Sequence, residues 1–205
     1  WEVNVAPPTG RSELERLVDI DTALKARDGA IYVVTYQGRA ASIDRETGEL
    51  LWTRDVSSNS GLDIDADGVY VSTADGAVLK INRRNGVETW RQQALSRRQL
   101  SPPALLGPLV AVADLSGYVH FLDRDTGALA ARVHPLSARV STPPVVAGDL
   151  VIMMDVEGRI AALRIKALGE EASGAVLRGG RGDGGGGGGT PETRTPSRNR
   201  PGLGR

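Results

Sequence analysis

One phrase recurs four times along this chain at nearly constant spacing. It first reads Gly-Ala-Ile-Tyr-Val-Val-Thr-Tyr-Gln-Gly at residues 29–38, and it returns from Gly68, Gly107 and Gly148. Its inner glycines are 38, 41 and 41 residues apart, at Gly38, Gly76, Gly117 and Gly158. A period of about 40 residues made of short strands is typical of a β-propeller, with one blade per repeat. The sequence therefore predicts an all-β fold, and it favours a binding surface over a reaction centre.

Each repeat contains short segments rich in β-branched residues and bounded by Gly, Asp or Asn, which is the pattern of strands. The first three repeats hold four such segments each. They cover 23–27, 31–35, 39–43 and 50–56, then 62–65, 69–73, 78–81 and 87–92, then 103–106, 109–113, 119–122 and 129–133. The fourth repeat has three, at 144–147, 151–154 and 159–165. The sequence thus predicts a propeller of four-stranded blades, about four of them in this chain.

The two ends of the repeat region look like complementary parts of one blade. The fourth repeat lacks a fourth strand, while residues 1–5 have the pattern of a fourth strand whose first three partners are absent. Propellers close by pairing the first strand of the chain with the last blade, which removes exposed edges. The residues leave two alternatives open: a ring of four blades, or about half of a larger ring.

Turn residues separate the strands at fixed positions. Asp44-x-x-Thr-Gly and Asp123-x-x-Thr-Gly predict turns in which the Asp side chain accepts hydrogen bonds from backbone amides, with Gly in the left-handed region. Ala66-Asp-Gly68 and Ala147-Gly-Asp149 predict hairpin turns in which Gly supplies a positive φ.

One segment near the start departs from the period. Trp1 and Trp52 are 51 residues apart, against 38 for Trp52 and Trp90, and the extra residues lie between 7 and 21. Insertions in a repeat scaffold form loops on one face, often the binding face. This one carries Asp19 and Asp21, which fit either turn capping or an acidic pair presented to a basic partner. The residues alone do not decide between these.

Composition excludes several classes of function. Lys plus Arg and Asp plus Glu balance at 25 each, and residues 174–205 carry a net charge of +4, so the remainder carries −4. A slightly acidic body gives no electrostatic reason to expect nucleic acid as a partner. There is no cysteine, which excludes disulfides and thiolate sites. Residues 167–205 are rich in Gly, Arg and Pro and predict a disordered tail after a partial propeller at 1–166. The start at Trp1 without Met suggests a fragment.

Neither a metal site nor a catalytic constellation stands out. Asp63-Ile-Asp-Ala-Asp-Gly68 imitates the start of a calcium loop, but the twelfth position, where that loop needs Glu, is Ala74. The only histidines are His120 and His134, too few for a zinc site. We therefore predict no metal, no cofactor and no enzymatic activity.

Two levels of resemblance follow from these residues. The repeated Ala-x-Ile-Asp-x-x-x-Gly-x-x-x-Trp phrase resembles the pyrroloquinoline-quinone-type propeller repeat, in which the Trp packs between blades, here Trp52 and Trp90. More specific phrases resemble the BamB family of the outer-membrane β-barrel assembly (BAM) machinery. They are Ser-Glu-Leu-Glu-Arg-Leu-Val-Asp-Ile-Asp at 12–21, Tyr-Gln-Gly-Arg at 36–39, Asp-Val-Ser-Ser-Asn-Ser-Gly-Leu at 55–62 and Gly-Tyr-Val-His-Phe-Leu-Asp at 117–123.

The resemblance to the BamB family implies a function. It implies the C-terminal half of an eight-bladed ring that acts without catalysis, as a scaffold binding the POTRA domains of BamA, with nascent outer-membrane proteins as further possible partners. Asp19 and Asp21, after Arg16, match the BamA-contacting patch of the family. The implied location is the periplasmic face of the outer membrane of a Gram-negative bacterium, held by an N-terminal lipid anchor that this chain lacks. The alternatives are a fragment of a quinone-dependent dehydrogenase or another protein-binding propeller.

Overall fold

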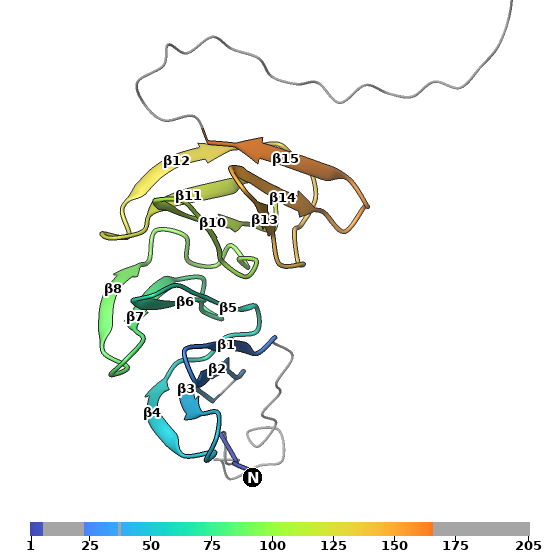
Figure 1. Cartoon of the computed structure of the whole chain (residues 1–205). Helices are drawn as coiled ribbons and strands as arrows, with labels where there is room; N and C mark the ends of the chain where they lie inside the picture. Colours follow the sequence, from blue (N-terminus) through green and yellow to red (C-terminus); the bar gives the residue numbers. More distant parts are fainter. Residues whose placement is uncertain (6–22, 37, 166–205) are drawn as a thin grey trace, which may run out of the picture. The chain divides into compact units, whose positions relative to one another are not determined.

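In a computed structural model of the chain, which describes residues 1–5, 23–36 and 38–165, every strand belongs to one of four antiparallel sheets. Figure 1 shows the sheets following one another in sequence order, coloured from blue to orange. Three sheets have four strands and the last has three, with neighbouring strands consecutive in sequence throughout. The all-β fold built of four-stranded blades is therefore confirmed.

The strands follow the prediction closely, because each blade is a meander whose turns are specified locally. The first sheet consists of β1 (Lys25–Arg27), β2 (Ala30–Val34), β3 (Arg39–Asp44) and β4 (Leu50–Asp55). The second consists of β5 (Gly61–Ile64), β6 (Gly68–Ser72), β7 (Val78–Asn82) and β8 (Glu88–Gln92). The third consists of β9 (Ala104–Leu106), β10 (Leu109–Ala113), β11 (Val119–Asp123) and β12 (Leu129–Val133). The last consists of β13 (Val145–Ala147), β14 (Leu150–Met154) and β15 (Ile160–Arg164).

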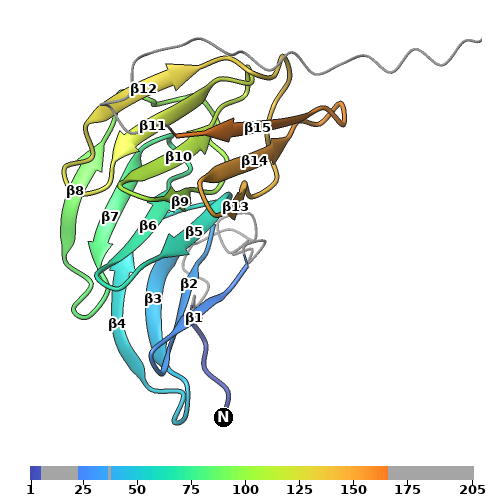
Figure 2. The ribbon, with the colours of Figure 1, turned by 45° about the horizontal axis from the view of Figure 1, so that its top comes forward.

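The hydrophobic core lies between successive sheets. Side chains of the first and second sheets share one buried cluster, which includes Tyr32, Trp52 and Val69. The second and third sheets share another, and the third and fourth a further one. The first strand of each sheet contacts the first strand of the next, β1 with β5, β5 with β9 and β9 with β13. This contact pattern is that of propeller blades whose first strands lie together at a common inner edge. Figure 2 shows the same ribbon turned by 45°, with the strands of successive sheets labelled.

The predicted Asp turns are confirmed. Oδ1 of Asp44 accepts hydrogen bonds from the backbone amides of Glu46 and Thr47 at 2.9 and 2.8 Å. Oδ1 of Asp123 accepts equivalent bonds from residues 125 and 126 at 3.1 and 2.8 Å. In each turn the glycine that follows has a positive φ, 76° at Gly48 and 72° at Gly127. The amide bonds from Thr47 and Glu46 lower the pKa of Asp44, and a 2.8 Å bond from the Thr126 hydroxyl, with the amide bonds, lowers the pKa of Asp123.

One of the two predicted hairpin turns is wrong in detail. Gly148 has the predicted positive φ of 62°, but Gly68 does not and instead begins β6. The Asp65 carboxylate holds that turn through the amides of Asp67 and Gly68, at 2.8 and 2.6 Å, so no left-handed residue is needed at Gly68. A side chain at Gly68 would also be tightly placed, because its Cβ would lie 3.0 Å from the Lys80 side chain.

The start of the chain also differs from the prediction. Residues 1–5, predicted as a strand, form none in the structure. Val3 and Val5 nevertheless pack against Val33 and Ile43 of the first sheet, as a fourth strand of a neighbouring blade would.

Candidate functional site

The partner-binding residues predicted from the sequence lie outside the described residues. Arg16, Asp19 and Asp21 belong to the segment 6–22, which connects residues 1–5 to the first sheet. Their assignment therefore stays a prediction. The predicted boundary at residue 166 and the predicted disorder of 167–205 stay predictions for the same reason.

Tryptophan side chains connect successive blades in the predicted way. Trp52 is 9% exposed, and its Nε1 donates a 2.8 Å hydrogen bond to the carbonyl of Arg83 in the next blade. The ring lies on Gly86, where a Cβ would be 2.9 Å from the indole. Trp90 repeats both contacts, with Arg124 O at 3.1 Å and Gly127 under its ring. We call this arrangement the tryptophan–glycine contact.

Trp1 makes a third tryptophan–glycine contact. Its Nε1 donates to the carbonyl of Arg45 at 3.0 Å and its ring lies on Gly48, although the side chain remains 62% exposed. The three indoles therefore recognise the same turn in three successive blades. Their role is structural, as expected from the repeat.

In the calcium-like segment at 63–68, the Asp63 and Asp65 carboxylates bind protein groups rather than remaining available to a metal ion. Asp65 accepts the two turn bonds and a 2.8 Å hydrogen bond from the Tyr70 hydroxyl, while Asp63 accepts from the amide of Leu105 at 3.1 Å and pairs with Lys25 at 3.3 Å. Within the described ranges, no three His, Cys, Asp or Glu side chains come together in a way that could hold a metal ion. No helix in the described part of the chain is long and apolar enough to cross a membrane.

A buried polar cluster in the third blade was not anticipated from the sequence. The Asp114 side chain is completely buried, and its Oδ2 lies 2.9 Å from Nη1 of Arg98 and 3.0 Å from Nε2 of His120. Its Oδ1 accepts the amides of Ser116 and Tyr118 at 2.9 and 3.1 Å. Burial alone would raise the pKa of Asp114, but these hydrogen bonds outweigh it and lower the pKa. The carboxylate is therefore ionised, and Nε2 of His120 donates to it.

Aromatic rings and a second arginine flank this cluster. The ring of Tyr118 stacks on His134 at 3.9 Å between centroids and with 8° between their planes. The guanidinium of Arg132 lies 4.9 Å from the Tyr118 centroid. Arg132 is also the register partner of His120 between β11 and β12. The cluster therefore joins the two outermost strands of the blade, β11 and β12, to the loop that carries Arg98.

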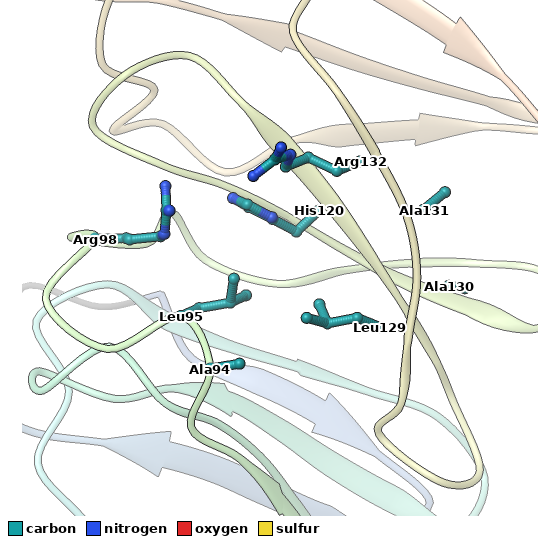
Figure 3. A pocket seen from close by; sticks show the side chains of 8 residues that line it. All are labelled: Ala94, Leu95, Arg98, His120, Leu129, Ala130, Ala131 and Arg132. Carbon is teal, nitrogen blue, oxygen red and sulfur yellow. The ribbon is translucent and has the colours of Figure 1, made fainter.

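A cavity of about 310 Å³ opens beside this cluster. The loop that follows β8 contributes Ala94, Leu95 and Arg98 to its lining, and β11 and β12 contribute His120, Leu129 and Arg132 (Figure 3). Asp114 does not single out this blade in the sequence, because the equivalent residues are Thr35, Thr73 and Asp155 in the other three repeats. The signal that could have pointed here is Leu129, which replaces Glu88 of the second repeat beside an arginine that both repeats have.

Comparison with known proteins identifies the family. A family model described as outer membrane protein assembly factor BamB matches residues 1–92 and 74–171. The chain belongs to the BamB family. It is 42% identical over 120 residues to BamB of Pseudomonas aeruginosa, covering 58% of this chain and 32% of that protein. It is 38% identical over 122 residues to BamB of Bordetella pertussis, covering 59% and 32% respectively. The chain thus spans about a third of the length of these BamB relatives.

Solved structures agree with the BamB assignment and with the fold. The crystal structure of BamB from Moraxella catarrhalis superposes with a TM-score of 0.75 at 28% identity, covering 80% of this chain and 49% of that one. The computationally designed Ika4 protein matches at 17% identity, with a TM-score of 0.64, over 81% of this chain and all of its own. A quinohemoprotein alcohol dehydrogenase from Comamonas testosteroni matches at 21% identity with a TM-score of 0.50, over 58% of this chain and 21% of its own. The last two show a shared fold alone.

Proposed function

We propose that the protein containing this chain is a non-catalytic scaffold in outer-membrane protein assembly, and that it binds the POTRA domains of BamA. The observation that carries the proposal is the BamB family match over both halves of the repeat region, together with the BamB structural match. The proposed location is the periplasmic face of the outer membrane, with nascent outer-membrane proteins as possible further partners.

The rival proposal, a fragment of a quinone-dependent dehydrogenase, has weaker support. Its structural match rests on the shared propeller fold at 21% identity, whereas the BamB relatives reach 42%. The dehydrogenase proposal would also require Ca²⁺ ligands, and the most calcium-like carboxylates, Asp63 and Asp65, are engaged by protein groups.

We further propose that Asp19 and Asp21, with Arg16, contact BamA. Two carboxylates two residues apart in an extended segment point to the same side, where they suit an Arg or Lys of the partner. Each charge-assisted hydrogen bond contributes about 1.5–3 kcal/mol. The segment lies outside the blade repeat, so a ladder of strands does not need these side chains.

The experiment substitutes both carboxylates, Asp19→Ala with Asp21→Ala, in the full-length protein, and measures binding to BamA by calorimetric titration. We expect affinity to fall by more than about tenfold with an unchanged melting temperature. The matched control is Asp55→Ala with Asp67→Ala, two exposed carboxylates that form no ion pair among the described residues, and it should bind as the wild type. Wild-type affinity in the Asp19 and Asp21 variant would refute the contact. Lost affinity together with unfolding would instead indicate turn capping.

A further inference from the structure

The cavity in the third blade combines cationic groups with apolar walls. Arg98, Arg132 and His120 supply polar atoms, while Ala94, Leu95 and Leu129 supply hydrocarbon surface (Figure 3). Arg98 and His120 both bond the buried Asp114 carboxylate, which fixes their positions. Arg132 makes no ion pair within the described residues, and its one recorded partner is the face of the Tyr118 ring.

The preceding blade has an arginine at the same position and pairs it with acids. Arg91 occupies the position of Arg132, five residues after the turn glycine. Its guanidinium forms a bidentate pair with Glu88, at 3.2 and 2.9 Å, and Asp75 also interacts with it electrostatically. In the third blade Leu129 replaces Glu88 and Ser116 replaces Asp75. Both neutralising acids are therefore missing, and an apolar wall stands where one of them would be.

The charges around the cavity leave room for one negative group. Arg98 and Arg132 contribute two positive charges and Asp114 one negative charge, so the arginines and the buried carboxylate sum to +1. A carboxylate balances this charge, whereas a phosphate monoester, at about −1.5 to −2, exceeds it. The planar guanidinium also matches carboxylate geometry in a bidentate pair.

The loop that carries Arg98 is held in a conformation that side chains rarely adopt. The residues on either side of it, Arg97 and Gln99, have φ values of 65° and 49°. Residues in this region are strained and persist where the surroundings determine their conformation. Here the Arg97 amide donates to Asp75 O, and the Arg98 carbonyl accepts from the Leu115 amide, each at 3.0 Å. Arg98 is therefore preorganised, which reduces the entropy lost on binding a ligand.

We propose that this cavity binds a carboxylate carried on an apolar body, and that its occupant is an acidic residue next to an apolar one in a segment of a partner protein. The cavity flanks β12, the outermost strand of its sheet, whose five residues are all exposed. A protein segment can reach such a position, with its acidic side chain paired to Arg132 and Arg98 and its apolar side chain against Leu95 and Leu129. This inference is independent of the BamA contact, which involves a different segment.

The test measures binding of a fluorescein-labelled Ser-Leu-Glu-Leu-Ser peptide to the full chain by fluorescence anisotropy, with a peptide carrying Gln in place of Glu as its control. Two variants remove the site. Arg132→Ala deletes the unpaired guanidinium. Leu129→Glu places an acid at the position of Glu88 in the second blade, where it can pair with Arg132 and neutralise its charge. Arg91→Ala is the matched control, because Glu88 already pairs that arginine. Because Arg132 and Leu129 are exposed, both substitutions should leave the melting temperature unchanged. Measuring it for each variant checks that the chain still folds.

We expect the Glu peptide to bind at least about tenfold more tightly than the Gln peptide, and both site variants to lose at least that factor. Arg91→Ala should retain binding within about twofold. No binding of the Glu peptide up to about 1 mM, equal binding of the Gln peptide, or unchanged binding in either site variant would overturn the proposal. A parallel titration with phosphatidylglycerol vesicles addresses the other anion source, and Arg132-dependent vesicle binding without peptide binding would also overturn it.

Discussion

The tryptophan–glycine contact makes a graded prediction about stability, because the same contact occurs at three levels of burial. A Trp side chain buries about 150–250 Å² when fully enclosed. At about 25 cal/mol per Å², that area corresponds to about 4–6 kcal/mol, as an upper bound. Trp52 is 9% exposed and also donates a buried hydrogen bond to Arg83 O, so Trp52→Ala should lower the free energy of unfolding by about 3–5 kcal/mol. Trp1 is 62% exposed, so Trp1→Ala should cost about 1–2 kcal/mol.

The assay is urea unfolding of the full chain followed by far-ultraviolet circular dichroism, which does not depend on the fluorescence of the deleted indole. The slope of free energy against urea should stay the same in both variants, so that the comparison reports stability rather than a change in cooperativity. A loss below about 1 kcal/mol for Trp52→Ala, or equal losses for the two variants, would refute the inter-blade role of Trp52.

Two further predictions follow from single contacts. Gly127→Ala should lower the free energy of unfolding by about 2 kcal/mol or more, because the new Cβ would meet the Trp90 ring at 2.6 Å and φ is 72°. The control is Gly107→Ala, with φ 55° and no atom within 4 Å of the new Cβ, which should cost only about 1 kcal/mol in the same urea titration. The lowered pKa of Asp114 means that its stabilisation is present above its unfolded pKa of about 4 and is lost as the pH falls through the folded pKa. Asp114→Asn should therefore be less stable than the wild type at pH 7, and the difference should shrink at acid pH; a constant difference would contradict this assignment.

The blade architecture could be predicted because its determinants are local. A turn such as Asp44 to Gly48 is specified within five residues, by a carboxylate that bonds nearby amides and a glycine with positive φ. Antiparallel neighbours then follow one another along the chain, so the hairpin turns set the pairing of the strands. The resemblance of the repeated phrase to the quinone-type propeller repeat also predicted that Trp52 and Trp90 pack between blades, and the structure shows each indole at the turn of the next blade.

Features that depend on distant partners were predicted less well. The residues at 1–5 have the composition of a strand, yet none of the four described sheets includes them. Composition alone does not show whether a segment joins a sheet, because that depends on a neighbouring strand. The turn at Gly68 is held by the Asp65 carboxylate, which the dipeptide Asp-Gly does not reveal. The cluster around Asp114 joins Arg98, 16 residues before it, to His120, six residues after it, and sequence proximity does not show this meeting.

The departures of the third blade from its own repeat coincide in space. Where the second blade has Thr73, Asp75, Leu79, Glu88 and Trp90, the third has Asp114, Ser116, His120, Leu129 and Ala131. His120, Leu129 and Ala131 line the cavity, and Asp114 bonds two of its polar residues, Arg98 and His120. A blade that only had to fold could keep the pattern of its neighbour, with Arg91 neutralised by Glu88 and Trp90 against the next turn. The third blade instead buries a carboxylate to position one arginine and leaves another without an acid. Asp155 stands at the position of Asp114 in the fourth repeat and is likewise buried, so a buried carboxylate alone does not distinguish the third blade. Arg132, which has no acid partner among the described residues, does distinguish it, and it is the reason to look for a ligand at this cavity.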